Sequence, residues 1–493
     1  MWRSDPATPE IRDRLGWLTV IDALRPQADA LAAWTAEVSR EYRHVVLLGM
    51  GGSSLAPLMF RDTFGAASGN PSLTVLDTTD PRAVAEVARM TAGPTLYLVS
   101  SKSGTTLETD CLFRYFWELH PERGREARFV AITDPHTPLA ALAGQYRFRR
   151  TFLNPPDIGG RYAALSYFGL VPAAVLGVDV ARLLDRAARM AQACGPQVPA
   201  AAHSGLRLGA TLGEAALAGR NKVTLVLSRG IAGFGLWLEQ LLAESTGKEG
   251  KGLIPVADEP LGSPEVYGSD RLFVALTLAP ERDGSLTARL AGLKAAGHPV
   301  VHIDLEDRYD IGGECFRWEF ATAVAGAVLG IHPFDQPDVA SSKANTDAVL
   351  ARGTADAKSA ASGAELTTFL SGVAPGDYIA LLAYLPPTPA NDRRLAAIRR
   401  RLRDRLRVAV TSGYGPRYLH STGQLHKGGP PTGHFLQITG APGPELQIPG
   451  KPFGFGVLES AQAEGDLLAL RRRGRPVLRL DGLELLEATA SGA

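Results

Sequence analysis

The feature that most constrains the fold is a regular alternation of short apolar runs with longer segments of helical periodicity. The runs hold three to five residues, mostly Val, Leu, Ile, Ala and Phe, and many stop at glycine or polar residues. Strands that alternate with helices favour parallel sheets covered by helices on both faces. The predicted strands are 45–48, 73–76, 96–99, 129–132, 223–227, 272–276, 300–303, 378–382, 408–410, 435–438 and 477–480.

These strands fall into three groups along the chain. A chain of 493 residues is too long for one ordinary core, so we expect two or three domains. We predict an N-terminal helical segment with a first α/β domain in residues 1–200, a second in 201–350 and a smaller C-terminal α/β block in 366–493. Residues 351–365, rich in Ala, Ser and Gly, are predicted to be a linker or a loose helix.

The charge balance and the cysteine content narrow the classes of partner. Lys plus Arg is 52 and Asp plus Glu is 51, which gives no electrostatic reason to expect nucleic acid or an anionic membrane. Three cysteines that lie far apart favour reduced thiols over disulfides or a zinc site, so no metal is expected. The sequence shows neither an apolar run of membrane-spanning length nor a signal peptide, and we expect a soluble, cytoplasmic protein.

Two loops rich in glycine and hydroxyl groups follow strands of the first predicted sheet. Residues 49–54 read Gly-Met-Gly-Gly-Ser-Ser, and residues 100–106 read Ser-Ser-Lys-Ser-Gly-Thr-Thr. Glycines allow close approach of a ligand, and a helix start offers free N–H groups to an anion. Each loop alone is equally well explained as a capped turn. Two of them at the carboxyl edge of one sheet favour a phosphate site.

Other residues suggest proton-transfer chemistry. Glu244 ends a predicted helix, where the helix dipole raises its proton affinity, as a general base requires, although an exposed helix-end Glu would look the same. Arg161 follows a Gly-Gly pair and could stabilise an oxyanion. His420 and His426 lie in one glycine-rich loop, and their spacing does not favour a metal site. Residues 393–407 form a basic amphipathic helix, for which a surface position is simpler than RNA or lipid binding.

Taken together, these segments resemble the glucose-6-phosphate isomerase (phosphoglucose isomerase) family, which is built from two sugar-isomerase (SIS) domains. Residues 49–57 are similar to the family's first phosphate loop, with Ala56 where the family usually has Gly, and residues 101–106 are similar to its second. Residues 159–162 are similar to its Gly-Gly-Arg segment. The resemblance implies that the first two predicted domains are SIS domains with parallel sheets flanked by helices.

Two further segments extend the resemblance to residue 343. Residues 244–248 read Glu-Ser-Thr-Gly-Lys and resemble Glu-Ser-Asn-Gly-Lys in the family, and residues 334–336 with Lys343 are similar to the segment that holds its C-terminal active-site Lys. The family's catalytic His, from a Gly-Thr-Asn-Gly-Gln-His segment, is missing, because residues 258–263 run on without one. We predict that His426, or with less support His420, replaces it. The whole chain most resembles the isomerase half of bacterial transaldolase/glucose-6-phosphate isomerase fusions.

The resemblance implies reversible conversion of glucose 6-phosphate to fructose 6-phosphate without a metal or redox cofactor. Glu244 would move a proton between C2 and C1, Arg161 would stabilise the enediolate, and Lys343 with the His would open the ring. The implied phosphate and substrate ligands are Gly52, Ser53, Ser101, Lys102, Ser103, Thr106, Gly160 and Gln336.

Two alternatives to this function stay open. One is an isomerase that also accepts mannose 6-phosphate. The other is a non-catalytic sugar-phosphate sensor, which is less favoured because no DNA-binding segment is recognised in the sequence. The resemblance further implies a homodimer, in which the neighbouring subunit commonly supplies the His, and a functional link to a transaldolase.

Overall fold

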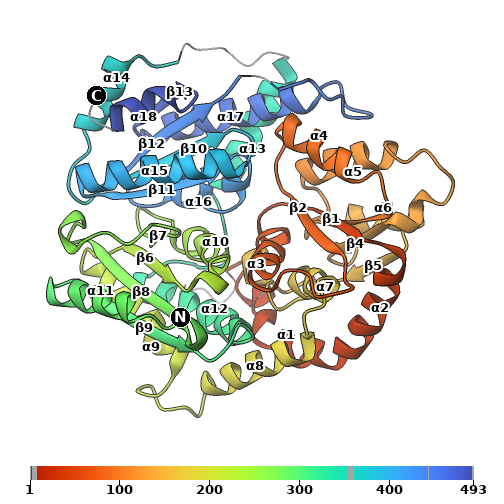
Figure 1. The fold of residues 1–493 in the computed structure, drawn as a ribbon, viewed down its shortest axis with the longest axis horizontal. Helices are drawn as coiled ribbons and strands as arrows, with labels where there is room; N and C mark the ends of the chain where they lie inside the picture. Colours follow the sequence, from red (N-terminus) through yellow and green to blue (C-terminus); the bar gives the residue numbers. More distant parts are fainter. Residues whose placement is uncertain (1, 3–7, 353–359, 442, 491–493) are drawn as a thin grey trace.

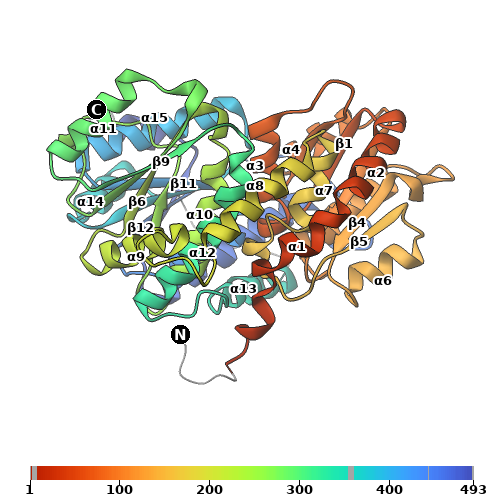
Figure 2. The ribbon, with the colours of Figure 1, turned by 90° about the horizontal axis from the view of Figure 1, so that it is seen from below.

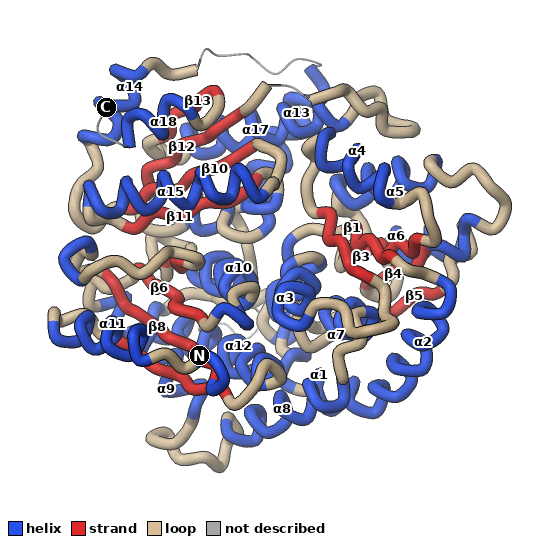
Figure 3. The backbone as a smooth tube through the Cα atoms, viewed as in Figure 1, coloured by secondary structure: helices blue, strands red, loops and turns tan. Residues whose placement is uncertain are grey.

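The computed structural model describes residue 2 and residues 8–352, 360–441 and 443–490, except for the side chains of residues 340–343. Within these residues, the chain forms three parallel sheets flanked by helices, which confirms the predicted α/β class. Figure 1 shows the sheets grouped around a centre where helices α3 and α10 face each other. Figure 3 shows the helices on the faces of each sheet.

The first sheet has five strands in the order β2-β1-β3-β4-β5. All neighbouring strands are parallel, and His44 of β1 pairs with Ser72 of β2 and Thr95 of β3. Its strands are β1 (His44–Leu48), β2 (Ser72–Leu76), β3 (Thr95–Ser100), β4 (Phe129–Thr133) and β5 (Arg150–Leu153). Its helices are α1 (Val20–Leu24), α2 (Ala28–Glu41), α3 (Leu55–Phe64), α4 (Pro81–Met90), α5 (Leu107–Glu118), α6 (Pro138–Gln145), α7 (Tyr167–Val175) and α8 (Val180–Ala193).

The second sheet has four parallel strands in the order β7-β6-β8-β9. Its strands are β6 (Lys222–Leu227), β7 (Ile254–Val256), β8 (Arg271–Leu278) and β9 (Val300–Leu305), and its helices are α9 (Ser204–Leu217), α10 (Phe234–Thr246), α11 (Gly284–Ala295) and α12 (Asp310–Leu329). The first two sheets share one apolar core, because Val45 of β1, Val223 of β6 and Trp237 of α10 belong to the same buried cluster.

The third sheet also has four parallel strands, in the order β11-β10-β12-β13. Its strands are β10 (Tyr378–Tyr384), β11 (Ala409–Tyr414), β12 (Gly433–Thr439) and β13 (Val477–Asp481). The helices of this part are α13 (Val339–Arg352), α14 (Gly363–Ser371), α15 (Pro389–Leu406), α16 (Gly423–Gly428), α17 (Phe455–Arg472) and α18 (Glu484–Ala490). It has an apolar cluster of its own around Leu381 and Leu436. Figure 2 shows the elements of the second and third sheets on one side of the molecule and the first sheet on the other.

All eleven predicted strands are present, and two further strands were not predicted. The missed strands are the edge strands β5 and β7. In β5 only Phe152 is buried, so the run lacks a continuous apolar pattern. In β7 there are three residues, and Pro255 at its centre disfavours a strand in sequence terms. Edge strands tolerate both features because one side of the strand needs no ladder partner.

The basic helix and the predicted linker differ in detail from expectation. Residues 393–407 lie mostly in α15, but Arg399 and Arg403 are buried rather than on the solvent face. Their guanidinium groups donate to backbone carbonyls, for example from Arg399 Nη2 to Ala257 O at 2.6 Å. Residues 351–365 include the end of α13 and the start of α14, and residues 353–359 lie outside the described residues.

Helix α13 is attached to the third sheet. It packs along α17, where Asn345 Nδ2 donates to Gly465 O at 3.2 Å and Arg472 Nη1 donates to Asn345 Oδ1 at 2.6 Å. The predicted domain 201–350 includes most of this helix, and the domain boundaries stay a prediction. Among the described residues, no helix combines the length and apolar character that crossing a membrane requires.

Candidate active site

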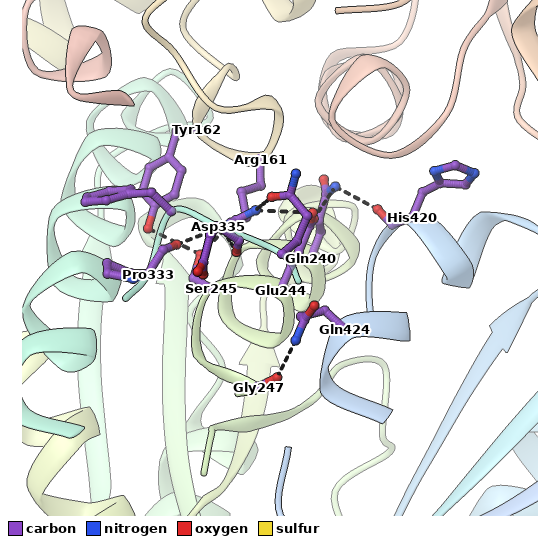
Figure 4. Close-up of polar contacts among 12 residues, drawn as sticks. Arg161, Tyr162, Gln240, Glu244, Ser245, Gly247, Pro333, Asp335, His420 and Gln424 are labelled. Carbon is purple, nitrogen blue, oxygen red and sulfur yellow. Dashed lines mark hydrogen bonds and ion pairs between the residues drawn. The ribbon is translucent and has the colours of Figure 1, made fainter. Parts of the chain in front are cut away.

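Arg161 makes most of the contacts in a cluster of polar side chains and backbone groups (Figure 4). It lies in a short 3-10 helix, η6 (Gly160–Tyr162), and its side chain is only 2% exposed. Its Nε donates to Ser245 Oγ at 2.8 Å, and its Nη1 lies 3.2 Å from Glu244 Oε1. Its Nη1 also donates to Gln336 Oε1 at 2.8 Å. The predicted residues Arg161, Glu244 and Gln336 therefore meet, although they come from three separate segments.

Glu244 lies in the last turns of α10, with 13% of its side chain exposed. Its Oε2 accepts a hydrogen bond from Gln240 Nε2 at 3.0 Å, one helical turn earlier. The same Gln240 nitrogen donates to the backbone oxygen of His420 at 2.8 Å. The guanidinium of Arg161 on one side and the amide of Gln240 on the other thus hold the Glu244 carboxyl group in one orientation, beside the segment that carries His420.

The first glycine-rich loop is pressed against this cluster. A Cβ at Gly52 would lie 2.2 Å from Gly160 O, and a Cβ at Gly51, whose φ is +55°, would lie 2.7 Å from His420 O. No larger residue fits these positions, so the glycines allow the loop to approach η6 and the His420 segment. Ser53 is buried, and its backbone oxygen accepts from Ser100 Oγ at 3.1 Å. The loop therefore connects the first sheet to Arg161.

The second loop forms a compact group of hydroxyls at the start of α5. Ser101 Oγ lies 3.0 Å from Thr106 Oγ1 and accepts from the backbone N–H of Gly104 at 3.1 Å. Thr105 Oγ1 donates to Ser103 Oγ at 2.9 Å. The ammonium group of Lys102 is paired with Asp134, so this predicted phosphate ligand has a partner within the protein.

A cavity of about 550 Å³ lies between the first sheet and the third-sheet helices. The second loop, α5, α13 and α17 line it, together with the 3-10 helix η10 (Arg417–His420), which follows β11. Its lining includes neither Glu244 nor Arg161. The polar groups that face it include Ser101, Thr105, Thr106, Glu108, His420, Lys451 and Gln462.

His420 contacts Glu108, which is hydrogen-bonded in turn to Gln462, and neither of these two residues was predicted. Its Nε2 lies 2.9 Å from Glu108 Oε1, and the same oxygen accepts from Gln462 Nε2 at 2.7 Å. Gln462 is oriented in turn by Thr79, whose Oγ1 donates to its amide oxygen at 2.7 Å. A carboxylate just after the hydroxyl loop could have marked Glu108 in the sequence. Nothing local to α17 distinguishes Gln462.

His426 is placed differently. Its ring packs against Tyr418 and Phe435, with centroids 5.9 and 5.0 Å away, and it is 3% exposed. Its Nδ1 is buried without a hydrogen-bond partner among the described residues. Burial lowers the pKa of His426 well below its ordinary value. Of the two candidate histidines, the structure brings His420, rather than the preferred His426, to the cavity.

The remaining site predictions concern Lys343 and metals. Lys343 belongs to α13, but its side chain lies outside the described part of the structure. Within the described residues, no group of three or more His, Cys, Asp or Glu side chains is arranged to hold a metal ion. The three cysteines, Cys111, Cys194 and Cys315, are buried and free.

Comparison with solved structures identifies the class of fold. The chain has a TM-score of 0.61 and 24% identity to a hypothetical protein, TT0462, from Thermus thermophilus, over 71% of this chain and 92% of that one. It has a TM-score of 0.56 and 21% identity to a glucose-6-phosphate isomerase from Chlamydia trachomatis, over 69% of this chain and 78% of that one. The protein thus has an α/β fold that it shares with a solved sugar-phosphate isomerase.

Sequence comparison identifies the family. The family model for phosphoglucose isomerase matches residues 19–251. A probable glucose-6-phosphate isomerase from Haloarcula marismortui is 30% identical over 373 residues, which cover 67% of this chain and 81% of the relative. A glucose-6-phosphate isomerase from Rubrobacter xylanophilus is 29% identical over 360 residues, 62% of this chain and 82% of the relative. The chain belongs to the phosphoglucose isomerase family. The third sheet, with His420, lies beyond the residues that the family model matches.

Proposed function

We propose that the protein interconverts glucose 6-phosphate and fructose 6-phosphate by proton transfer through an enediolate. Family membership supports the reaction, and one observation carries the choice of groups: Arg161 Nη1 lies 3.2 Å from Glu244 Oε1 in a nearly buried cluster. Isomerisation needs a base beside the reacting carbons and a cation for the oxygen on which negative charge develops. This pair supplies both.

In the proposed reaction, Glu244 takes the proton from C2 and returns it to C1. Arg161 stabilises the enediolate oxygen, and Gln336, which shares its guanidinium, orients the same end of the sugar. The hydroxyls of Ser101, Ser103 and Thr106 bind the phosphate, together with the backbone of Gly52 and Gly160 and the hydroxyl of Ser53. Lys102, which is paired with Asp134, contributes charge beside the loop rather than a direct contact.

Ring opening requires a group that moves a proton between the ring oxygen and the C1 hydroxyl. We assign it to His420, whose Nε2 lies 2.9 Å from Glu108 Oε1 at the cavity wall. A carboxylate that contacts one ring nitrogen orients the imidazole and stabilises its protonated form. Lys343 stays the second predicted participant, and His426 is not assigned a part.

The test is a Glu244→Gln variant compared with wild type and with Glu214→Gln, an exposed residue of α9. Loss of the base should lower kcat by about 10²- to 10⁴-fold. Calorimetric binding of fructose 6-phosphate should be retained. Full activity in Glu244→Gln would show that Glu244 is not the base. Binding without turnover in the wild type would favour the sensor alternative.

The finer features of the prediction stay proposals. Acceptance of mannose 6-phosphate is decided by measuring turnover with that sugar. A homodimer and a functional link to a transaldolase remain predictions, for which sedimentation and co-purification are the direct measurements. We likewise propose that the protein is cytoplasmic.

A further inference from the structure

Lys248 is a buried cation that the proposed chemistry does not use. It lies two residues beyond α10, and its side chain is 3% exposed. Its Nζ donates to the backbone oxygen of His332 at 2.5 Å and to Asp335 Oδ1 at 2.7 Å. Both acceptors belong to one short segment, residues 332–336, which follows α12 and which we call the 332–336 turn.

The same turn holds Arg161. Its Nη2 donates to Pro333 O at 2.7 Å and to Asp335 O at 2.9 Å, and its Nη1 donates to Gln336. The turn therefore offers three acceptors to Arg161 and two to Lys248. Because three hydrogen bonds join the Arg161 guanidinium to the turn, a displacement of the turn should move the guanidinium relative to Glu244.

The cost of burying the Lys248 amine argues against a role in packing alone. Burial, reinforced by the nearby charge of Arg161 and partly opposed by Asp335 and Glu244, lowers the pKa of Lys248 to about 7. Keeping an ammonium in this position costs free energy that an apolar side chain would not. Lys248 thus places a hydrogen-bond donor where packing alone does not require one, and its partners are acceptors beside those of Arg161.

We propose that Lys248 is a positioning residue, which locks the 332–336 turn so that Arg161 is held against Glu244. The kinetic consequence of this inference depends on the proposed function. A small misplacement of a charge-stabilising group is costly, because its contribution depends on fixed geometry in a site shielded from water. Lys248 itself touches no described group that we assign to the substrate.

The test compares Lys248→Met and Lys248→Arg with Lys251→Met. Lys251 is a matched control, because it lies three residues further along and donates to Leu329 O at 2.8 Å, outside the turn. We expect Lys248→Met to lower kcat by about 10- to 100-fold with KM within about threefold, in the range of a misplaced group. Lys248→Arg should recover part of the loss, and Lys251→Met should behave as wild type.

A second readout does not depend on turnover. Amide hydrogen exchange should increase in the 332–336 turn and around Arg161 in Lys248→Met, but not in Lys251→Met. The proposal is overturned if folded Lys248→Met keeps kcat within twofold of wild type. It is also overturned if its exchange is unchanged, or if activity falls only in proportion to the folded fraction. An inactive wild type would refute the proposed function alone, since the exchange experiment still decides whether Lys248 locks the turn.

Discussion

Residues 417–420 and 423–428 follow the same strand, β11, and each segment carries a histidine that the sequence presents in the same glycine-rich surroundings. The two histidines nevertheless lie in different tertiary environments. His420 faces a cavity shared with the first sheet and contacts Glu108 at 2.9 Å. His426 lies inside the third-sheet packing, against Phe435 of β12.

The difference follows from what anchors each segment. In η10, Arg417 makes a bidentate ion pair with Asp77 of the first sheet, with distances of 2.8 and 2.7 Å. In α16, Lys427 pairs with buried Asp466 of α17 at 2.7 Å, within the third-sheet part of the chain. The environment of each histidine therefore follows from the distant residue that anchors its segment, not from the histidine or its immediate neighbours.

The largest difference between the two histidines should appear when His420 is replaced. His420→Asn should lower kcat by about 10²- to 10⁴-fold, the contribution of a positioned acid or base. Steady-state kinetics on ring-closed and on freshly ring-opened substrate should place the loss in ring opening. A variant with wild-type turnover on the closed sugar would remove His420 from the mechanism.

A smaller effect is expected at Glu108. In Glu108→Gln the contact with His420 loses its charge, and charge-assisted hydrogen bonds are roughly twice as strong as neutral ones. We expect kcat to fall by about 10-fold, since one pKa unit of interaction corresponds to about 1.4 kcal/mol. Glu118→Gln, at the other end of α5, is the control. Equal activity in the two variants would mean that Glu108 does not orient the histidine.

Gln462 extends the comparison to the third sheet, because it reaches Glu108 from α17. Gln462→Met keeps the shape of the side chain but removes the amide that donates to the Glu108 carboxylate. It should lower kcat by roughly threefold, because only part of the roughly 1.5–3 kcal/mol of a hydrogen bond to a charged group is felt two contacts away from the substrate. The effect should disappear in a Glu108→Gln background. Additive losses in the double variant would show that the two residues act separately.

The smallest effect on turnover is expected at His426. His426→Leu should leave kcat within about threefold, because the ring lies in packing where volume-conserving apolar changes are tolerated. The change should instead appear in the pH dependence of stability. Burial, reinforced by Lys427 and Arg475, lowers the pKa of His426 well below its ordinary value of 6.5.

The sign of that dependence follows from proton counting. Below pH 6.5 the unfolded chain binds a proton at His426 that the folded chain does not, so wild-type stability falls as pH decreases, by up to about 1.4 kcal/mol per unit. His426→Leu lacks this contribution and should lose less stability between pH 7.5 and 5.5 in urea unfolding. Parallel curves for the two proteins would contradict the buried, neutral state of His426.

Much of the fold was predictable because its information is local. The alternation of apolar runs and helical segments located eleven strands, and the failures, β5 and β7, are edge strands with one buried residue or a central proline. The loops after β1 and β3 were recognised from composition alone. Parallel strands bring such loops to one sheet edge, so their position followed from the class of fold.

The parallel α/β architecture, the family and the segments that carry Arg161, Glu244 and Gln336 could be predicted from the sequence, since they depend on periodicity and on short contiguous motifs. The packing of separate sheets, in contrast, brings His420 rather than His426 to the cavity and places Glu108 and Gln462 next to it, and it joins Lys248 to the segment that holds Arg161. These contacts could not be predicted because the residues that make them are far apart along the chain. His420 and Glu108 are separated by 312 residues, and no local pattern records which side chains the packing of separate sheets will bring within hydrogen-bond reach.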